Sequence, residues 1–137
     1  MKWLAVDYGD SRTGLAGCDE SETVTSPITP QIEEKSMNKV AAAVVDAARA
    51  RQAAGLVCGL PKNMDGTEGK RAEKSRRFAQ RLADMAGMPV VMWDERLTTN
   101  AAEQILIESG VRRENRKSVI DKIAAVLILQ GYLDLQA

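Results

Sequence analysis

Acidic side chains must carry any chemistry in this chain of 137 residues, because it contains no histidine. The absence of histidine excludes Ser-His-Asp and Cys-His catalysis, His-ligated zinc and an imidazole general base. The most conspicuous acid is Asp7, which ends the apolar run from Trp3 to Val6. A carboxylate buried at a strand end needs a cation or backbone donors as partners, whereas an aspartate that caps a turn fits this position equally well.

Three more acids lie where they could join Asp7. Asp94 and Glu95 follow the apolar run from Pro89 to Trp93, and Asp121 lies on the last predicted helix. Adjacent strand residues point to opposite faces, so only one of Asp94 and Glu95 can face a site, and periodicity does not say which. The spacing Ser118-x-x-Asp121 is also that of a capping box. Carboxylates from two strand ends and a helix would suit Mg²⁺, a hard cation that takes oxygen ligands.

Hydrophobic periodicity predicts the elements that position these acids. Three strands come first: Trp3 to Val6, a return strand through Leu15 and Ala16, and Thr23 to Ile28, in which Pro27 favours an edge position. The remaining elements are a helix from the N-cap Ser36 to Gly55, a strand from Leu56 to Leu60, a loop from Lys62 to Gly69, a helix from Arg71 to Ala86, a strand from Pro89 to Trp93, a helix from residues 98–100 to Gly110, and a helix from Ser118 toward Tyr132.

This order predicts an α/β fold in a single domain over residues 1–137. We expect a five-stranded mixed sheet in which strands 1–3 are antiparallel and strands 1, 4 and 5 are parallel, with helices on both faces. Open sheets of this kind place their sites beyond the carboxyl ends of the parallel strands. Asp7, the loop over residues 61–69 and Glu95 all fall at that edge.

Basic residues are clustered even though 19 Lys and Arg balance 19 Asp and Glu. The clusters are Lys62, Lys70, Arg71, Lys74, Arg76, Arg77 and Arg81, and then Arg112, Arg113, Arg116 and Lys117. Arg12, Lys62 and Arg96 lie near the acids and could orient a phosphate, or could pair with Asp10, Asp65 and Asp94. The basic helix could bind nucleic acid or be a solvated face with a Glu73 to Arg77 pair. The glycines of residues 66–69 could offer backbone N–H groups to phosphate.

Other sequence features bear on the location of the protein, the state of its cysteines and its mode of recognition. We expect a cytoplasmic protein with no membrane association, because the N-terminus has no leader pattern and no apolar run is long enough to span a bilayer. Cys18 and Cys58 should be free thiols. Trp3, Phe78 and Trp93 fit a core, and we expect Tyr8 to pack beneath a helix. With few aromatic residues to stack on bases, recognition of backbone and shape is favoured.

Four segments together resemble one known family. They are DYGDSRTGLA at 7–16, GLPKNMDGTEGKRAEKSRRFAQRL at 59–82, DERLTT at 94–99 and DKIAAVLILQGYL at 121–133. In order and spacing they are similar to the signature segments of the YqgF family, small bacterial RNase H-like proteins related to the RuvC Holliday junction resolvases and assigned as pre-16S rRNA nucleases. The D-x-G hairpin alone is shared with sugar-kinase and actin-like ATPases, so nucleotide binding would indicate an ATP-binding switch instead.

The resemblance implies a metal-dependent nuclease whose catalytic and metal-binding residues are Asp7, Glu95 and Asp121, holding two Mg²⁺ or Mn²⁺ ions about 4 Å apart. The residues expected to bind the nucleic acid are Arg12, Lys62, Lys70, Arg71, Arg77 and Arg96. The favoured substrate is the 16S rRNA precursor in ribosome biogenesis. One alternative is that the chain cleaves branched DNA as a Holliday junction resolvase, which would be a symmetric homodimer. The other alternative is a non-catalytic nucleic-acid-binding module.

Overall fold

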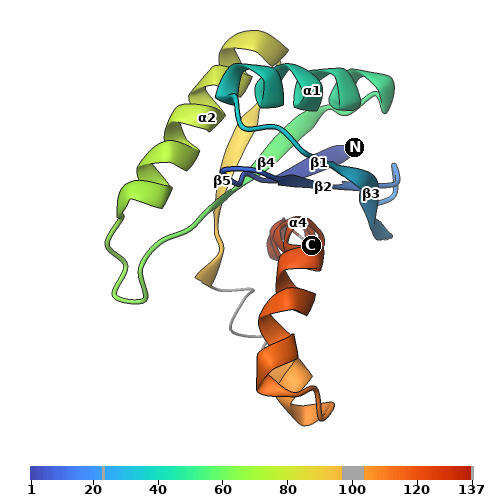
Figure 1. Cartoon of the computed structure of the whole chain (residues 1–137). Helices are drawn as coiled ribbons and strands as arrows, with labels where there is room; N and C mark the ends of the chain where they lie inside the picture. Colours follow the sequence, from blue (N-terminus) through green and yellow to red (C-terminus); the bar gives the residue numbers. More distant parts are fainter. Residues whose placement is uncertain (23, 97–103, 137) are drawn as a thin grey trace.

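One five-stranded mixed sheet organises the chain, in the order β3-β2-β1-β4-β5 (Figure 1). The strands are β1 (Trp3–Asp7), β2 (Thr13–Cys18), β3 (Thr25–Ile32), β4 (Gly55–Leu60) and β5 (Val90–Asp94). β1 pairs antiparallel with β2 and parallel with β4, and β4 pairs parallel with β5. The predicted sheet is therefore confirmed. This computed structural model describes residues 1–22, 24–96 and 104–136, with the backbone alone for residues 117, 118 and 120–122.

Helices cover both faces of the sheet, as predicted. α1 (Met37–Ala50) and α2 (Lys70–Ala86) lie on one face, and α4 (Arg113–Gln136) lies on the other (Figure 1). Residues 104–108 are also helical. Within the described ranges, no helix is both long enough and apolar enough to cross a membrane.

The side chains of alternate β1 residues lie in two separate hydrophobic cores. Leu4 and Val6 pack with α1 and α2, whereas Trp3 and Ala5 pack with α4. Because strand side chains alternate between faces, Asp7 shares the α4 face with Trp3 and Ala5. Tyr8 has the opposite parity and stacks on the buried Phe78 of α2, with ring centroids 4.2 Å apart, which confirms its predicted packing role.

Several predicted boundaries were wrong for identifiable reasons. α1 ends at Ala50, not Gly55, because Gln52 takes the left-handed conformation (φ 57°) that turns the chain. Gly55 instead begins β4 beneath Trp3, whose ring would lie 2.3 Å from an added Cβ. β3 runs to Ile32, beyond the predicted end at Ile28, since an edge strand tolerates proline. Its predicted first residue, Thr23, lies outside the described residues.

The start of α4 corrects a more important expectation. The helix begins at Arg113, five residues before the predicted Ser118. Ser118 and Asp121 therefore lie inside the helix, where backbone N–H groups bond to the preceding turn and need no cap. The capping-box interpretation of Asp121 was wrong. The preceding helix was predicted to start at residues 98–100, which lie outside the described part of the chain.

Other local predictions are confirmed. Ser36 caps α1 by accepting a hydrogen bond from the Lys39 backbone N–H at 3.4 Å. Gly87 ends α2 with φ 66°, a conformation that glycine adopts without strain. Cys18 and Cys58 are both free and buried, as expected.

Candidate functional site

Asp7 and Glu95 meet on the α4 face at the carboxyl edge of the sheet. Asp7 is the last residue of β1, and Glu95 follows directly after β5. The Glu95 backbone N–H donates to the carbonyl of Leu60 at 3.2 Å, which fixes Glu95 at the end of β4. The side chains of Glu95 and Asp7 are hydrogen-bonded to each other. Two of the three predicted catalytic acids thus converge in space.

A glycine, Gly59, makes room for this pair and is a site residue beyond the predicted set. An added Cβ on Gly59 would lie 2.8 Å from the Glu95 carboxyl carbon and 2.6 Å from Cδ1 of Ile128 in α4. Real Cβ atoms essentially never approach heavy atoms so closely, so any larger residue at position 59 would require the ends of the Glu95 and Ile128 side chains to shift. A glycine inside an apolar strand is the available sequence signal for such a close approach.

The electrostatics of the pair favour a bound cation. Burial, and then the negative charge of Asp7 and the hydrogen bond to it, raise the pKa of Glu95 from 4.5 to about 8. The positive charge of Arg71 opposes this shift, whereas Asp94 adds to it. Without a cation the pair stays together by sharing a proton, because like charges this close cannot both ionise cheaply. A divalent cation would replace that proton, so the donor set fits a hard metal ion.

Asp121 lies inside α4, one turn before Ala125. Ala125 lies at the site: an added Cβ on Gly14, the cross-strand partner of Asp7, would be 3.9 Å from the Ala125 Cβ and 4.0 Å from the Asp7 Cβ. The Asp121 side chain is outside the described residues, so the predicted third ligand is placed by its backbone alone. Among the side chains that the structure describes, no group of three His, Cys, Asp or Glu residues gathers as a metal site.

Asp94 is engaged elsewhere, by Arg96. The Arg96 guanidinium contacts both Asp94 carboxylate oxygens, at 2.7 Å from Nη2 and 3.1 Å from Nε, and holds the pKa of Asp94 below its usual range. Arg96 also donates through Nη1 to the carbonyl of Met64 at 3.1 Å. Its observed contacts therefore tie the end of β5 to the loop after β4.

The basic face of α2 is partly neutralised. Lys74 pairs with Asp10 at 3.1 Å, and Arg76 forms a two-pronged pair with Glu68 at 2.5 and 2.8 Å. Arg81 donates to Asn38 of α1.

The predicted nucleic-acid ligands of α2 remain available to a partner. Lys70, Arg71 and Arg77 are exposed, and the ion pairs of the described residues include none of the three. The alternative pair between Glu73 and Arg77 is not among those ion pairs. The end of α2 nearest the carboxylates therefore carries uncommitted positive charge.

The two remaining predicted cations differ in their surroundings. Arg12 is exposed in the β1–β2 turn, and its suggested partner Asp10 is bound to Lys74 instead. Lys62 is half-buried, and its charge contributes to the lowered pKa of Asp94. The suggested partner of Lys62, Asp65, accepts hydrogen bonds from Thr67. Lys62 therefore lies on the Asp94 side of the site.

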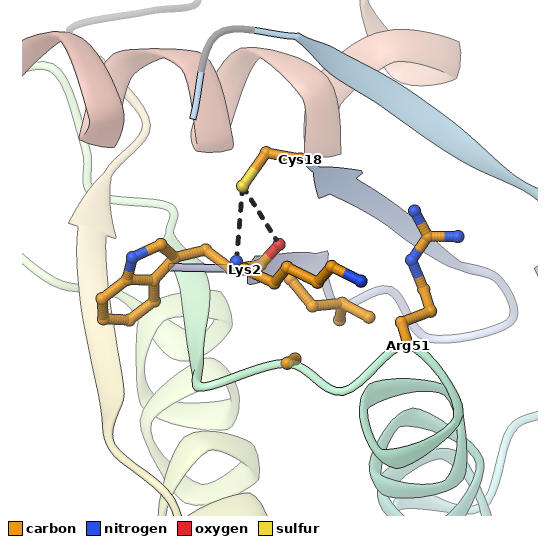
Figure 2. Close-up of a pocket in the computed structure, with 6 residues that line it drawn as sticks. Lys2, Cys18 and Arg51 are labelled. Carbon is orange, nitrogen blue, oxygen red and sulfur yellow. Dashed lines mark hydrogen bonds between the residues drawn. The ribbon is translucent and has the colours of Figure 1, made fainter. Parts of the chain in front are cut away.

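A separate hollow lies at the opposite, amino edge of the sheet (Figure 2). Lys2 and Arg51 border it, and the Cys18 thiol accepts a hydrogen bond from the Trp3 N–H at 3.3 Å beside it. Because it lies at the other end of the parallel strands, this hollow is distinct from the carboxylate site.

The sheet order and the flanking helices define an α/β fold of the RNase H-like kind, which the chain shares with RuvC. The structure of Thermus thermophilus RuvC in complex with a Holliday junction substrate matches with a TM-score of 0.65, over 99% of this chain and 95% of that chain, at 14% identity. A second Thermus thermophilus RuvC structure matches with a TM-score of 0.61 at 12% identity, over 99% of this chain and 96% of that one.

The chain belongs to the RuvX family, whose model is described as "Holliday junction resolvase" and matches residues 1–135. A relative from Agathobacter rectalis is 42% identical over 98% of this chain and 95% of its own length. Another, from Symbiobacterium thermophilum, is 45% identical over 100% of this chain and 94% of its own length. Both relatives carry the name "Putative pre-16S rRNA nuclease". RuvX membership confirms the resemblance to the YqgF family.

Proposed function

We propose that this chain is a metal-dependent nuclease that hydrolyses phosphodiester bonds in structured nucleic acid. The observation that carries the proposal is the Asp7 and Glu95 pair at the carboxyl edge of the sheet beside Gly59, where burial first and the charge of Asp7 second disfavour the ionised form of Glu95. A pair maintained at such a cost is explained by a ligand that neutralises it. The names of the RuvX-family relatives support the same reaction class.

Asp7, Glu95 and Asp121 would hold the metal, two Mg²⁺ or Mn²⁺ ions. When bound, such ions supply an activated water and stabilise the leaving oxygen. Inclusion of Asp121 is supported by its position one turn before Ala125, on a helix that packs against the site, and by the loss of its capping role. The protein itself contributes fixed carboxylate positions and a buried setting that strengthens their attraction for a cation.

The surrounding cations would bind the substrate backbone. Lys70, Arg71 and Arg77 offer exposed charge on α2, and Arg71 acts on Glu95 directly through its field. Lys62 and Arg12 would add contacts on the loops at the same edge. Arg96 would act mainly by neutralising Asp94, which leaves Glu95 as the acid available to metal at this strand end.

The favoured substrate is the precursor of 16S rRNA, a role that would place the protein in the cytoplasm. The names of the relatives support this substrate. Branched DNA is the second candidate, because the RuvX description and the fold shared with RuvC both point to Holliday junctions. A resolvase of this kind would act as a symmetric homodimer.

The test is cleavage of a precursor 16S rRNA fragment and a four-way DNA junction, with Mg²⁺ or Mn²⁺ and with chelator. We expect metal-dependent cleavage of one substrate by the wild type and none by Asp7→Asn, with equal folding of both proteins by circular dichroism. The substrate that is cut decides between RNA and DNA. Binding without cleavage, unchanged in Asp7→Asn, would overturn the proposal in favour of a non-catalytic binding module.

A further inference from the structure

Met64 is a large apolar side chain that is exposed to solvent. It is 72% exposed, in the loop between β4 and α2. A single exposed methionine on a mobile loop would need no explanation. Met64 differs because the backbone that carries it is fixed.

Hydrogen bonds close the loop on itself. The Asn63 backbone N–H donates to the Thr67 carbonyl at 2.8 Å, and the Gly66 N–H donates to the Asn63 carbonyl at 2.9 Å. The Asp65 carboxylate accepts from the Thr67 N–H at 2.9 Å and from its hydroxyl at 2.6 Å. Gly66 allows the sharp turn with φ 90°. Met64 therefore occupies the tip of a closed turn.

Arg96 then attaches this turn to the site. Its Nη1 donates to the Met64 carbonyl at 3.1 Å while its other nitrogens hold Asp94. The loop begins directly after Leu60, and the Leu60 carbonyl accepts a hydrogen bond from the Glu95 backbone N–H. The start of the loop is therefore bonded to the residue that carries one of the site carboxylates. Figure 1 shows this loop at the same edge of the sheet as the end of β5.

Several cations border the exposed methionine, and the acids of the same loop are engaged locally, Asp65 with Thr67 and Glu68 with Arg76. Lys62 precedes it in the same loop, and Lys70 and Arg71 begin the helix that follows. An apolar tip bordered by cations is complementary to a nucleic acid, in which apolar base faces lie between phosphates. Proteins that kink nucleic acids insert methionine and other apolar side chains between base steps, where these side chains partly unstack the bases.

We propose that Met64 is a wedge that packs against an opened base step of the substrate beside the scissile phosphate. The fixed turn presents the Met64 backbone already in place, so the loop itself loses little conformational entropy on binding. The preferred substrate would then carry a weakly stacked step, as at a boundary between duplex and single strand or at a branch point. This inference rests on the proposed nuclease function and specifies which substrates that site prefers.

Binding is tested without cleavage in the Asp7→Asn background. The probes are a duplex RNA with a single-stranded extension and a four-way DNA junction, each with 2-aminopurine at the boundary or branch. We expect bound protein to change the 2-aminopurine fluorescence, Met64→Leu to retain the change, and Met64→Ala to lose most of it and bind about tenfold more weakly. Met85→Ala is the matched control, because Met85 is 40% exposed in the last turn of α2, away from this loop.

Cleavage assays on proteins that keep Asp7 separate the wedge proposal from the nuclease proposal. If Met64→Ala and Met85→Ala give the same fluorescence change and the same cleavage, the wedge is overturned while the nuclease stands. If wild-type protein cleaves nothing and Met64→Ala still binds tenfold more weakly with the fluorescence change lost, the wedge stands and the nuclease does not. If the wild type neither binds nor cleaves either probe, both proposals are refuted.

Discussion

Replacing Glu95 by glutamine should stabilise the metal-free protein at alkaline pH, although it removes a proposed catalytic group. The amide has nearly the shape of the carboxyl group and can still donate a hydrogen bond to Asp7. It carries no charge, so the burial penalty and the repulsion from Asp7 that raise the pKa of Glu95 to about 8 are both absent. A loss of activity with a gain of stability is the expected signature of a strained functional acid.

The magnitude follows from proton linkage. The folded state holds the Glu95 proton up to about pH 8, whereas the unfolded chain releases it near pH 4.5. The folded state therefore binds more protons between these values, so the metal-free wild type loses stability as pH rises through this window. At about 1.4 kcal/mol per pKa unit the full shift is worth roughly 4–5 kcal/mol. Water entry and relaxation around the pair reduce this, so we expect Glu95→Gln to gain ~2–3 kcal/mol at pH 8 and little at pH 4.5.

The assay is urea denaturation of both proteins in chelator at several pH values, repeated with Mg²⁺. Glu33→Gln is the matched control, because Glu33 is an exposed carboxylate outside the site and its removal should change little. Mg²⁺ should stabilise the wild type and not Glu95→Gln. An equal or lower stability of Glu95→Gln at pH 8, with the same pH slope as the wild type, would refute the reasoning.

Three further substitutions test the site and its support. Gly59→Ala should lower the free energy of unfolding by ~1–3 kcal/mol in urea denaturation and displace Glu95. Gly69→Ala, with only ordinary contacts around its Cβ, should lose only the preference for glycine at the N-cap of α2, about 1 kcal/mol or less, and leave Glu95 in place. Phe78→Ala should cost ~3–5 kcal/mol in the same assay, since Phe78 is fully buried; a cost under about 1 kcal/mol would contradict its core role. Arg71→Gln should weaken nucleic-acid binding and reduce the salt slope of the binding constant by ~1, and an unchanged slope would exclude a phosphate contact.

Much of the fold could be predicted because the strand and helix periods are clear. β1, β4 and β5 are short apolar runs separated by helical patterns, which forces parallel pairing and brings their carboxyl ends to one edge. That geometry places Asp7 near the end of β5 before any coordinates are known. The choice between Asp94 and Glu95 could not be made from residues alone, because it depends on which face of β5 meets α4.

The failures also have physical causes. Residues 113–116 are polar and largely exposed, so the first turn of α4 has no apolar stripe to reveal it. Missing that turn made Ser118 look like a cap. Gly59 was detectable as a glycine inside an apolar strand, but its role depends on Glu95 and Ile128, which are distant in sequence. The fixed exposure of Met64 was not detectable, because it depends on an arginine 32 residues away.

The central claim, that Asp7, Glu95 and Asp121 form one metal centre, is tested most directly by Mn²⁺ binding measured by calorimetry and electron paramagnetic resonance. The wild type should bind Mn²⁺, and Asp7→Asn, Glu95→Gln and Asp121→Asn should each lose at least one bound ion or bind much more weakly while remaining folded. Asp121→Asn that binds Mn²⁺ with wild-type stoichiometry and affinity would contradict the three-carboxylate centre.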